Sequence, residues 1–390
     1  MTPNTEAFDE WIRSHFVEMN TLLEEAYFSL DQRTAIAAVE PATKTRLLEE
    51  GSEFVSTLLG EGNTDEGFDS AYDLLGNVGL YMSACHRHEI DAANTAAPDA
   101  IKNANALALQ LGASVGLTPR FSTAHLTTHN RAVDGAYKSF TSLHDEQIFL
   151  EFNCRGIFSY KRAADALVRI LPLGVSHAVT HDLLKVAKDA LQDVVSFNDQ
   201  LFEQLDADRF FYNVRPYYKT YRVGRFDYRG SNGGDFSGIN EIDLLLGLCR
   251  AEDPSYSQLL VDKFLYIRPE EQARLRDAMR RRSLLQHFLD AIDGHSNDKW
   301  FQRNAALFLE VCEMHGAAAA QHHDQLVNRF IQQPSESLSQ QDFDLVTASG
   351  PPLEVVIRAL EKLRDLRMAA DRDDIPSAYG DLQRIRAGIG

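Results

Sequence analysis

The sequence is poor in basic residues: 39 Lys and Arg face 57 Asp and Glu, for a formal net charge of −18. Nucleic acids and anionic membrane surfaces bind basic faces, so this balance argues against both as partners. No apolar run approaches the ~18 residues of a transmembrane helix. Residues 1–16 are polar and acidic and lack the apolar core of a secretory signal. From these absences we expect a cytoplasmic protein.

Cysteine is also scarce, and the four cysteines are far apart in the chain, at Cys85, Cys154, Cys249 and Cys312. Without a CxxC pair, neither a zinc ribbon nor a thioredoxin-like motif is present. We therefore expect reduced thiols, mostly buried, rather than disulfides or metal ligands.

Sustained strand alternation is absent, and the helical period dominates instead. Residues 6–30 carry apolar side chains at three- and four-residue steps, which predicts one amphipathic helix: Phe8, Trp11, Ile12, Phe16, Met19, Leu22 and Leu23. Similar patterns recur at 43–62, 71–90, 98–113, 137–173, 176–205, 239–249, 270–292, 299–331 and 352–370. We expect an all-α fold with a small N-terminal helical domain over residues 1–115 and a larger one over 116–390.

Residues 208–238 interrupt the helical pattern with aromatic, Arg and Gly residues. Irregular chain of this length is usually functional or disordered, and its many aromatic residues argue against disorder. Two interpretations stay open. The segment is a structural loop packed on the core, or it lines a pocket for a flat aromatic ligand whose carboxylate is clamped by Arg215 or Arg222. Its Gly-rich end, 229–238, permits close approach of the backbone but fits no nucleotide-binding motif.

Three histidines occupy the apolar helix predicted over 299–331: His315 and the adjacent pair His322 and His323. Neighbouring residues on an α-helix point about 100° apart, so the pair cannot face one ligand, and periodicity does not choose between them. Each is either a core histidine or a ligand for haem iron, which needs only one neutral imidazole. The small residues 316–320 would let a flat porphyrin approach the helix.

Four further histidines lie at predicted helix ends or in loops: His86, His88, His125 and His129. Each could act as an acid, a base or a hydrogen-bond donor over a bound ligand. The plainer interpretation is that they are exposed to water.

With these residues in view, the sequence resembles the tryptophan and indoleamine 2,3-dioxygenase superfamily of haem proteins, and within it the monodechloroaminopyrrolnitrin synthase (PrnB) branch. The resemblance extends from about Phe68 to Leu366 in the same order. It is carried by "HLTTHN" from His125, "FFYNVR" from Phe210, "RGSNGGDFSG" from Arg229 and "HDQLVNR" from His323.

The resemblance implies a helical, indoleamine dioxygenase-like haem fold and a role for each matching residue. His323 would bind the iron of haem b, with Leu326, Val327 and Arg329 in register after it. Arg215 would pair with a substrate carboxylate, and Phe210 and Phe211 would pack on the substrate ring. The residues bordering the substrate or a haem propionate would be Gly230, Ser231, Gly233, Gly234 and His125.

The chain departs from the superfamily at two places. The superfamily's Gly/Thr-rich turn near the amino-acid end of the substrate has only "TASGPP" as its counterpart, with Thr347, Ser349 and Gly350. The distal-helix histidine motif of the dioxygenases is not clearly present, so no distal base is transferred. These departures argue against a housekeeping tryptophan dioxygenase.

The implied function is a haem b-dependent oxygenase that uses O2 or peroxide on a tryptophan-like or other aromatic amino acid, in secondary metabolism. Ring cleavage, mono-oxygenation and rearrangement all remain open as outcomes. Two other hypotheses are a haem-binding sensor or carrier without turnover, and a helical interaction module without haem.

Overall fold

The computed structural model describes residues 2–62, 67–91, 98–336, 338 and 353–389. Helices make up nearly all of the regular structure in these ranges, which confirms the expected all-α fold. Within them the strands are β1 (Tyr221–Val223) and β2 (Phe226–Tyr228), which form one short antiparallel hairpin with Tyr221 opposite Tyr228.

The chain forms two compact units, each built from segments that are separate in the sequence. The first comprises residues 1–151, 205–235 and 329–352, and the second 152–204, 236–328 and 353–390. The N-terminal helical region expected over residues 1–115 lies within the first unit, where residues 116–151 and two later segments join it.

The first unit is built on five N-terminal helices: α1 (Pro3–Arg13), α2 (His15–Phe28), α3 (Pro41–Glu61), α4 (Phe68–Arg87) and α5 (Pro98–Val115). The short 3-10 helix η1 (Thr123–Leu126) and the start of α6 (His144–Leu173) follow. The segment after residue 205 adds α8 (Ala207–Arg209), the π-helical η2 (Phe210–Val214), the 3-10 helix η3 (Arg215–Tyr218) and the hairpin. The last part of the unit holds the end of the π-helical η4 (His322–Gln332) and α14 (Gln333–Ser335).

The single helix expected over residues 6–30 is wrong, because the chain breaks at Ser14 between α1 and α2. The Ser14 hydroxyl donates to the carbonyl of Glu10 at 2.7 Å, and the Ser14 N–H bonds to Trp11, which ends α1. The apolar period survives the break: Phe8 and Phe16 are fully buried on either side of it.

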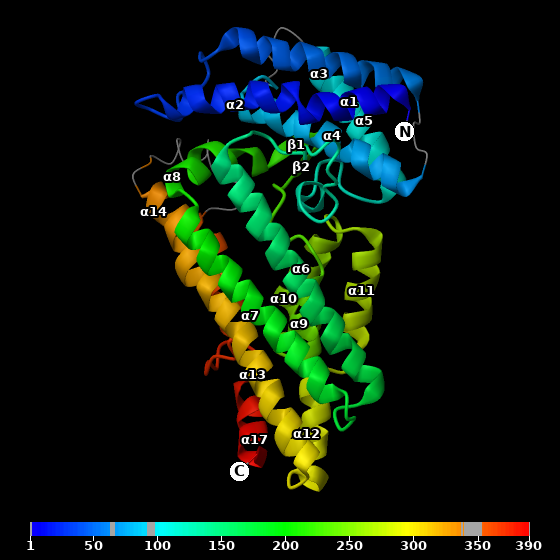
Figure 1. The fold of residues 1–390 in the computed structure, drawn as a ribbon, viewed down its shortest axis with the longest axis vertical. Helices are drawn as coiled ribbons and strands as arrows, with labels where there is room; N and C mark the ends of the chain where they lie inside the picture. The colour runs from blue at the N-terminus through cyan, green and yellow to red at the C-terminus, as the bar shows by residue number, and fades with distance from the viewer. Residues whose placement is uncertain (1, 63–66, 92–97, 337, 339–352, 390) are drawn as a thin grey trace. The chain divides into compact units, whose positions relative to one another are not determined.

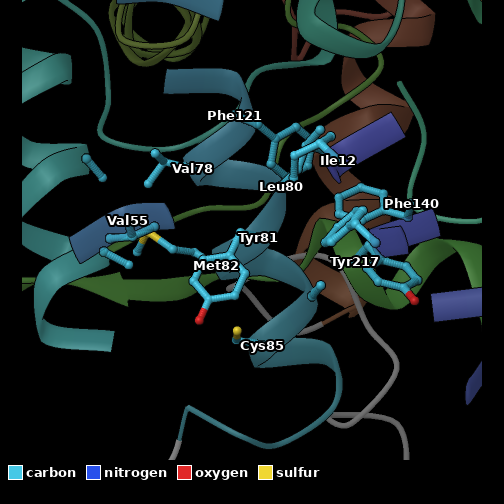
Figure 2. Packing of buried hydrophobic residues seen from close by; sticks show 14 of the residues in the cluster. Ile12, Val55, Val78, Leu80, Tyr81, Met82, Cys85, Phe121, Phe140 and Tyr217 are labelled. Atoms are coloured by element: carbon cyan, nitrogen blue, oxygen red, sulfur yellow. The ribbon is translucent and has the colours of Figure 1, made fainter. Parts of the chain in front are cut away.

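The core of the first unit joins these helices to the irregular middle segment (Figure 2). Phe140 stacks on Tyr217 with ring centroids 4.2 Å apart, and Tyr81 donates its hydroxyl to the carbonyl of Leu48. Tyr218 and Tyr221 belong to the same cluster. Tyr217, Tyr218 and Tyr221 are therefore core residues, as expected if residues 208–238 form a structural loop packed on the core.

The second unit contains the rest of α6 and a set of helices around it: α7 (Thr180–Gln204), α9 (Gly238–Leu246), α10 (Pro254–Phe264), α11 (Pro269–Arg280), α12 (Leu284–His295), α13 (Lys299–Gln321), the start of η4, α16 (Leu353–Arg367) and α17 (Tyr379–Ile389). The two long helices α7 and α13 run alongside each other (Figure 1). The core includes Phe288, Phe301 and Phe308, all fully buried.

Gly316, the first of the small residues 316–320 of α13, packs on protein. A Cβ added at Gly316 would lie 3.0 Å from the Cα of Met368 and 3.1 Å from the carbonyl of Arg367. Gly316 therefore lets α13 lie close to the chain at the end of α16. From the sequence, we expected the small residues here to make room for a porphyrin instead.

All four cysteines carry free thiols, and three of them are buried: Cys85, Cys249 and Cys312. This agrees with the expectation of reduced thiols in the core. Among the helices in the described ranges, none has the length and apolar character needed to cross a membrane.

Candidate functional site

His322 and His323 begin a π-helical segment, η4, that continues α13 as far as Gln332. The sequence predicts an ordinary α-helix through both residues, and the structure differs here. A second π-helical segment, η2, carries Phe210 and Phe211 and leads directly into Arg215. π-helical turns are rare and often occur at functional sites. Here they occur at the two segments for which the family resemblance implies a function, the segment 210–215 and the His323 segment.

The His323 ring is held through Nδ1 in the second unit. Nδ1 lies 2.8 Å from Oδ1 of Asp324, and Nη1 of Arg364 lies 2.8 Å from the same oxygen. Burial alone would raise the pKa of Asp324, but the hydrogen bonds from His323 and Arg364 lower it below its ordinary value. Asp324 is therefore ionised at neutral pH and can only accept a hydrogen bond.

This geometry fixes the tautomer of His323. A 2.8 Å contact between a ring nitrogen and an ionised carboxylate requires a proton on the nitrogen, so Nδ1–H donates to Asp324. Arg364 Nη1 also lies 3.3 Å from Nδ1, but two N–H donors cannot bond each other. In the neutral form of the ring, the lone pair is therefore on Nε2.

The haem implied by the resemblance can be tested against this arrangement. Nε2 of His323 is buried and has no hydrogen-bond partner among the described residues, and the side chain is 14% exposed. A metal-binding histidine commonly donates its other ring N–H to a carboxylate, which orients the ring and leaves the free nitrogen for the metal. The residues present thus fit an iron ligand at His323, while His322 is exposed.

His315, the third histidine of the region, belongs to a buried polar cluster. Its Nε2–H donates to Oδ1 of Asp243 at 2.7 Å, and Arg367 binds both oxygens of Asp243 at 2.8 Å. The hydroxyl of Tyr256 donates to Oδ2 of Asp243 at 2.7 Å. Sequence reasoning missed Asp243 and Arg367. The signal was an acidic residue in the otherwise apolar run "IDLLLGL".

Arg215 and Arg222, the two arginines proposed from the sequence, have opposite environments in the first unit. Arg215 is buried, and its guanidinium lies over the Phe211 ring, 5.6 Å from the centroid. Burial lowers the pKa of Arg215 to about 10, so the group stays charged at neutral pH. The Arg222 side chain is 68% exposed and pairs with Asp227 across the hairpin. The structure therefore favours Arg215 as a candidate carboxylate clamp.

Phe210 and Phe211 also differ. Phe211 is fully buried beneath Arg215, whereas Phe210 is half-buried. The Phe210 ring lies 4.9 Å from Phe149 and 5.8 Å, edge-on, from Phe330. Phe330 belongs to η4, so the two π-helical segments meet at these rings.

The Gly-rich loop after the hairpin is ordered by Asp235. Its carboxylate binds the Arg229 guanidinium through both oxygens at 2.9 Å and accepts the backbone N–H of Asn232. The backbone N–H of Gly234 donates to the Asn232 side chain. Gly230 and Ser231 are buried, and Gly233 and Gly234 are half-buried. The backbone N–H groups of Asn232 and Gly234 are thus used inside the loop.

His125 is a buried residue with both ring nitrogens bonded, so the exposed position expected for it is wrong. It is 2% exposed, and its ring stacks on Tyr72 with centroids 3.9 Å apart. Ser122 N–H donates to Nδ1 at 2.9 Å, and Nε2–H donates to the carbonyl of Tyr72 at 2.8 Å. Burial lowers the pKa of His125 to about 3. His88 is likewise fully buried.

The structure brings some of these residues together within the first unit. The hydroxyls of Thr123 and Ser231 lie 2.8 Å apart, which joins the η1 segment of His125 to the Gly-rich loop. Arg120, which sequence reasoning missed, donates to the carbonyls of Lys219 and Tyr228 and so ties the end of η3 to the hairpin. His323 belongs to the second unit. Thr347, Ser349 and Gly350 lie outside the described residues.

A comparison with known protein families matches the model of monodechloroaminopyrrolnitrin synthase PrnB to residues 2–389 of the chain. The match covers nearly the whole sequence and includes every residue discussed above. Its name is that of a synthase, so the family is one of enzymes. On this match, the chain belongs to the monodechloroaminopyrrolnitrin synthase PrnB family.

Proposed function

We propose that this protein is a haem b-dependent oxygenase that acts on a tryptophan-like or other aromatic amino acid, with O2 or peroxide as co-substrate. His323 is the proposed iron ligand. The observation that carries the proposal is the state of its ring: Nδ1–H is held by Asp324, and Nε2 is buried without a hydrogen-bond partner among the described residues. Membership of the PrnB family supports it.

Bound haem supplies the activation of oxygen, and the protein supplies binding, orientation and electrostatics. Arg215 is proposed to bind the substrate carboxylate, since a buried guanidinium offers a planar pair of donors matched to two carboxylate oxygens. Phe211 lies under that guanidinium. It would fix the position of the guanidinium, and orientation of this kind contributes much of a catalysed rate.

Phe210 is the better of the two phenylalanines for contact with a substrate ring. It is half-buried and already lies in an aromatic group with Phe149 and Phe330. Aromatic rings pack favourably in tilted and edge-on arrangements such as these. An aromatic substrate ring would extend the group. Ser231 and the glycines of the loop are proposed to border the substrate.

The test of haem binding is an absorbance spectrum of the full-length protein purified with haem supplied. We expect a Soret band in the wild type and in His322→Ala, and its loss in His323→Ala. Added imidazole should restore a ligated spectrum to His323→Gly. Absence of the band in the wild type, or its persistence unchanged in His323→Ala, would overturn the proposal.

The test of turnover is incubation of the haem-loaded protein with a panel of aromatic amino acids under O2 or with peroxide. We expect a substrate-dependent spectral shift and a product whose mass separates ring cleavage, mono-oxygenation and rearrangement. A protein that binds haem through His323 but neither shifts nor turns over any aromatic compound would be a sensor or carrier.

A further inference from the structure

Asp324 and Arg364 surround the protonated nitrogen of His323. One oxygen of Asp324, Oδ1, accepts two hydrogen bonds: one from Nδ1 of His323 and one from Nη1 of Arg364, each at 2.8 Å. Asp324 and Arg364 carry opposite charges, and they act on one hydrogen bond.

Arg364 is itself anchored. Its Nε and Nη2 both lie 2.8 Å from Oδ1 of Asp365, and Arg372 binds the other oxygen of Asp365. The Arg364 side chain is 21% exposed, whereas Asp324 is 54% exposed. Asp365 and Arg372 therefore hold the Arg364 guanidinium in place against the exposed carboxylate of Asp324.

A carboxylate that accepts the second N–H of a ligating imidazole fixes the ring and makes the ligating nitrogen more basic. A cation on the same carboxylate oxygen withdraws negative charge from that hydrogen bond. Asp324 should thus strengthen electron donation through Nε2, and Arg364 should weaken it. The two residues have opposite effects on a metal bound at Nε2.

We propose that Asp324 and Arg364 are a positioning pair that sets the tautomer of His323 and the electron density it donates, and hence the reduction potential of a bound haem. This inference rests on the proposed function, since it takes His323 as the iron ligand. It goes beyond that function because it assigns the tuning of the iron to two residues outside the ligand.

The test compares Asp324→Asn and Arg364→Gln in the haem-loaded, full-length protein. Asparagine keeps an oxygen that accepts from Nδ1–H but removes the charge, so the iron–histidine stretching frequency of the ferrous form should fall and the reduction potential should rise. Arg364→Gln should move both quantities in the opposite direction. Asp324→Glu should restore part of the wild-type values, and Arg358→Gln, an exposed change on the same helix, should leave them unchanged.

Opposite signs separate this role from a structural one, because a loosened site would shift both variants in the same direction. If haem binds through His323 but both variants keep the wild-type stretching frequency, the pair does not tune the iron, and the proposed function still stands. If the wild type binds no haem, or binds it without His323, the proposed function and the pair both fail.

Discussion

Arg367 binds Asp243 through both carboxylate oxygens, at 2.8 Å each, in the interior of the second unit. Asp243 has no exposed surface. Burial alone would raise the pKa of Asp243, but Arg367 and His315 hold it well below its usual range. The carboxylate is thus charged and buried, and it depends on its partners on α13 and α16 for compensation.

Loss of Arg367 should therefore be costly. Arg367→Ala leaves the Asp243 charge buried without its main partner, and removal of one member of a buried pair costs about 3–5 kcal/mol. Arg358→Ala is the matched control, because Arg358 lies on the same helix with its side chain 76% exposed. It should change stability by no more than about 0.5 kcal/mol. Chemical denaturation of both variants measures the difference, and equal midpoints would contradict the assignment.

A second prediction concerns the close approach of α4 to the chain before η1. A Cβ added at Gly79 would lie 2.1 Å from the backbone nitrogen of Phe121, and backbone cannot turn aside as a side chain can. Gly79→Ala should destabilise the protein by about 1–3 kcal/mol.

The control for Gly79 is Gly156→Ala, inside α6, where an added Cβ meets nothing within 4 Å. Alanine is favoured over glycine in a helix by about 0.5–1 kcal/mol, so this variant should be more stable than the wild type. The two substitutions should shift the thermal midpoint in opposite directions. An unchanged or raised midpoint in Gly79→Ala would show that the approach at Gly79 is not tight.

The apolar period of the sequence predicts where helices lie because it records which side chains are buried. Phe8 and Phe16 are both in the core, as the pattern requires. It does not predict the break at Ser14, since that depends on one serine hydroxyl bonding the Glu10 carbonyl. It does not predict the π-helical turns that begin at His322 either, because the buried residues in them, Leu326, Val327 and Phe330, keep the three- and four-residue steps of an ordinary α-helix.

In the candidate site, too, some residues could be predicted from the sequence and others could not. His323 and Arg215 could be named from short sequence motifs. The cluster of Asp243, His315 and Arg367 could not, because three segments far apart in the chain supply its members and only the fold brings them together. Without the family motif, the composition of residues 208–238 left Arg215 and Arg222 equivalent. Burial separates them, and burial is a property of the folded chain.

His125 predicts a pH dependence of stability. Its pKa is about 3 in the folded protein against an ordinary value of 6.5, mainly because of burial. Between these values the unfolded chain binds the extra proton and the folded protein does not, so stability is lost as pH falls from 6.5 towards 3. The loss should approach about 1.4 kcal/mol per pH unit.

His125→Gln removes the titrating group and so isolates its contribution. The difference in unfolding free energy between wild type and variant should be constant above pH 7 and should shrink steadily below pH 6.5. Urea denaturation at several pH values between 4 and 8 measures it. A difference that does not change with pH would mean that His125 is protonated equally easily in both states.

The proposed carboxylate clamp gives the last prediction. Arg215→Gln keeps a polar side chain but removes the charge and the forked pair of donors. Truncation of one partner in a buried, hydrogen-bonded charge pair costs about 2 kcal/mol or more, so affinity for the aromatic amino acid should fall at least about 30-fold. Arg222→Gln removes the exposed arginine that pairs with Asp227 and should leave affinity unchanged.

Binding is measured by titration of the spectral shift of the haem-loaded protein, and the Soret band reports whether each variant is folded. The decarboxylated amine of the same amino acid supplies a second control. Its affinity should be weak and equal in the wild type and in Arg215→Gln, because it has no carboxylate to bind. If Arg215→Gln binds the amino acid as tightly as the wild type does, the carboxylate is held elsewhere, and Arg215 is a buried structural cation.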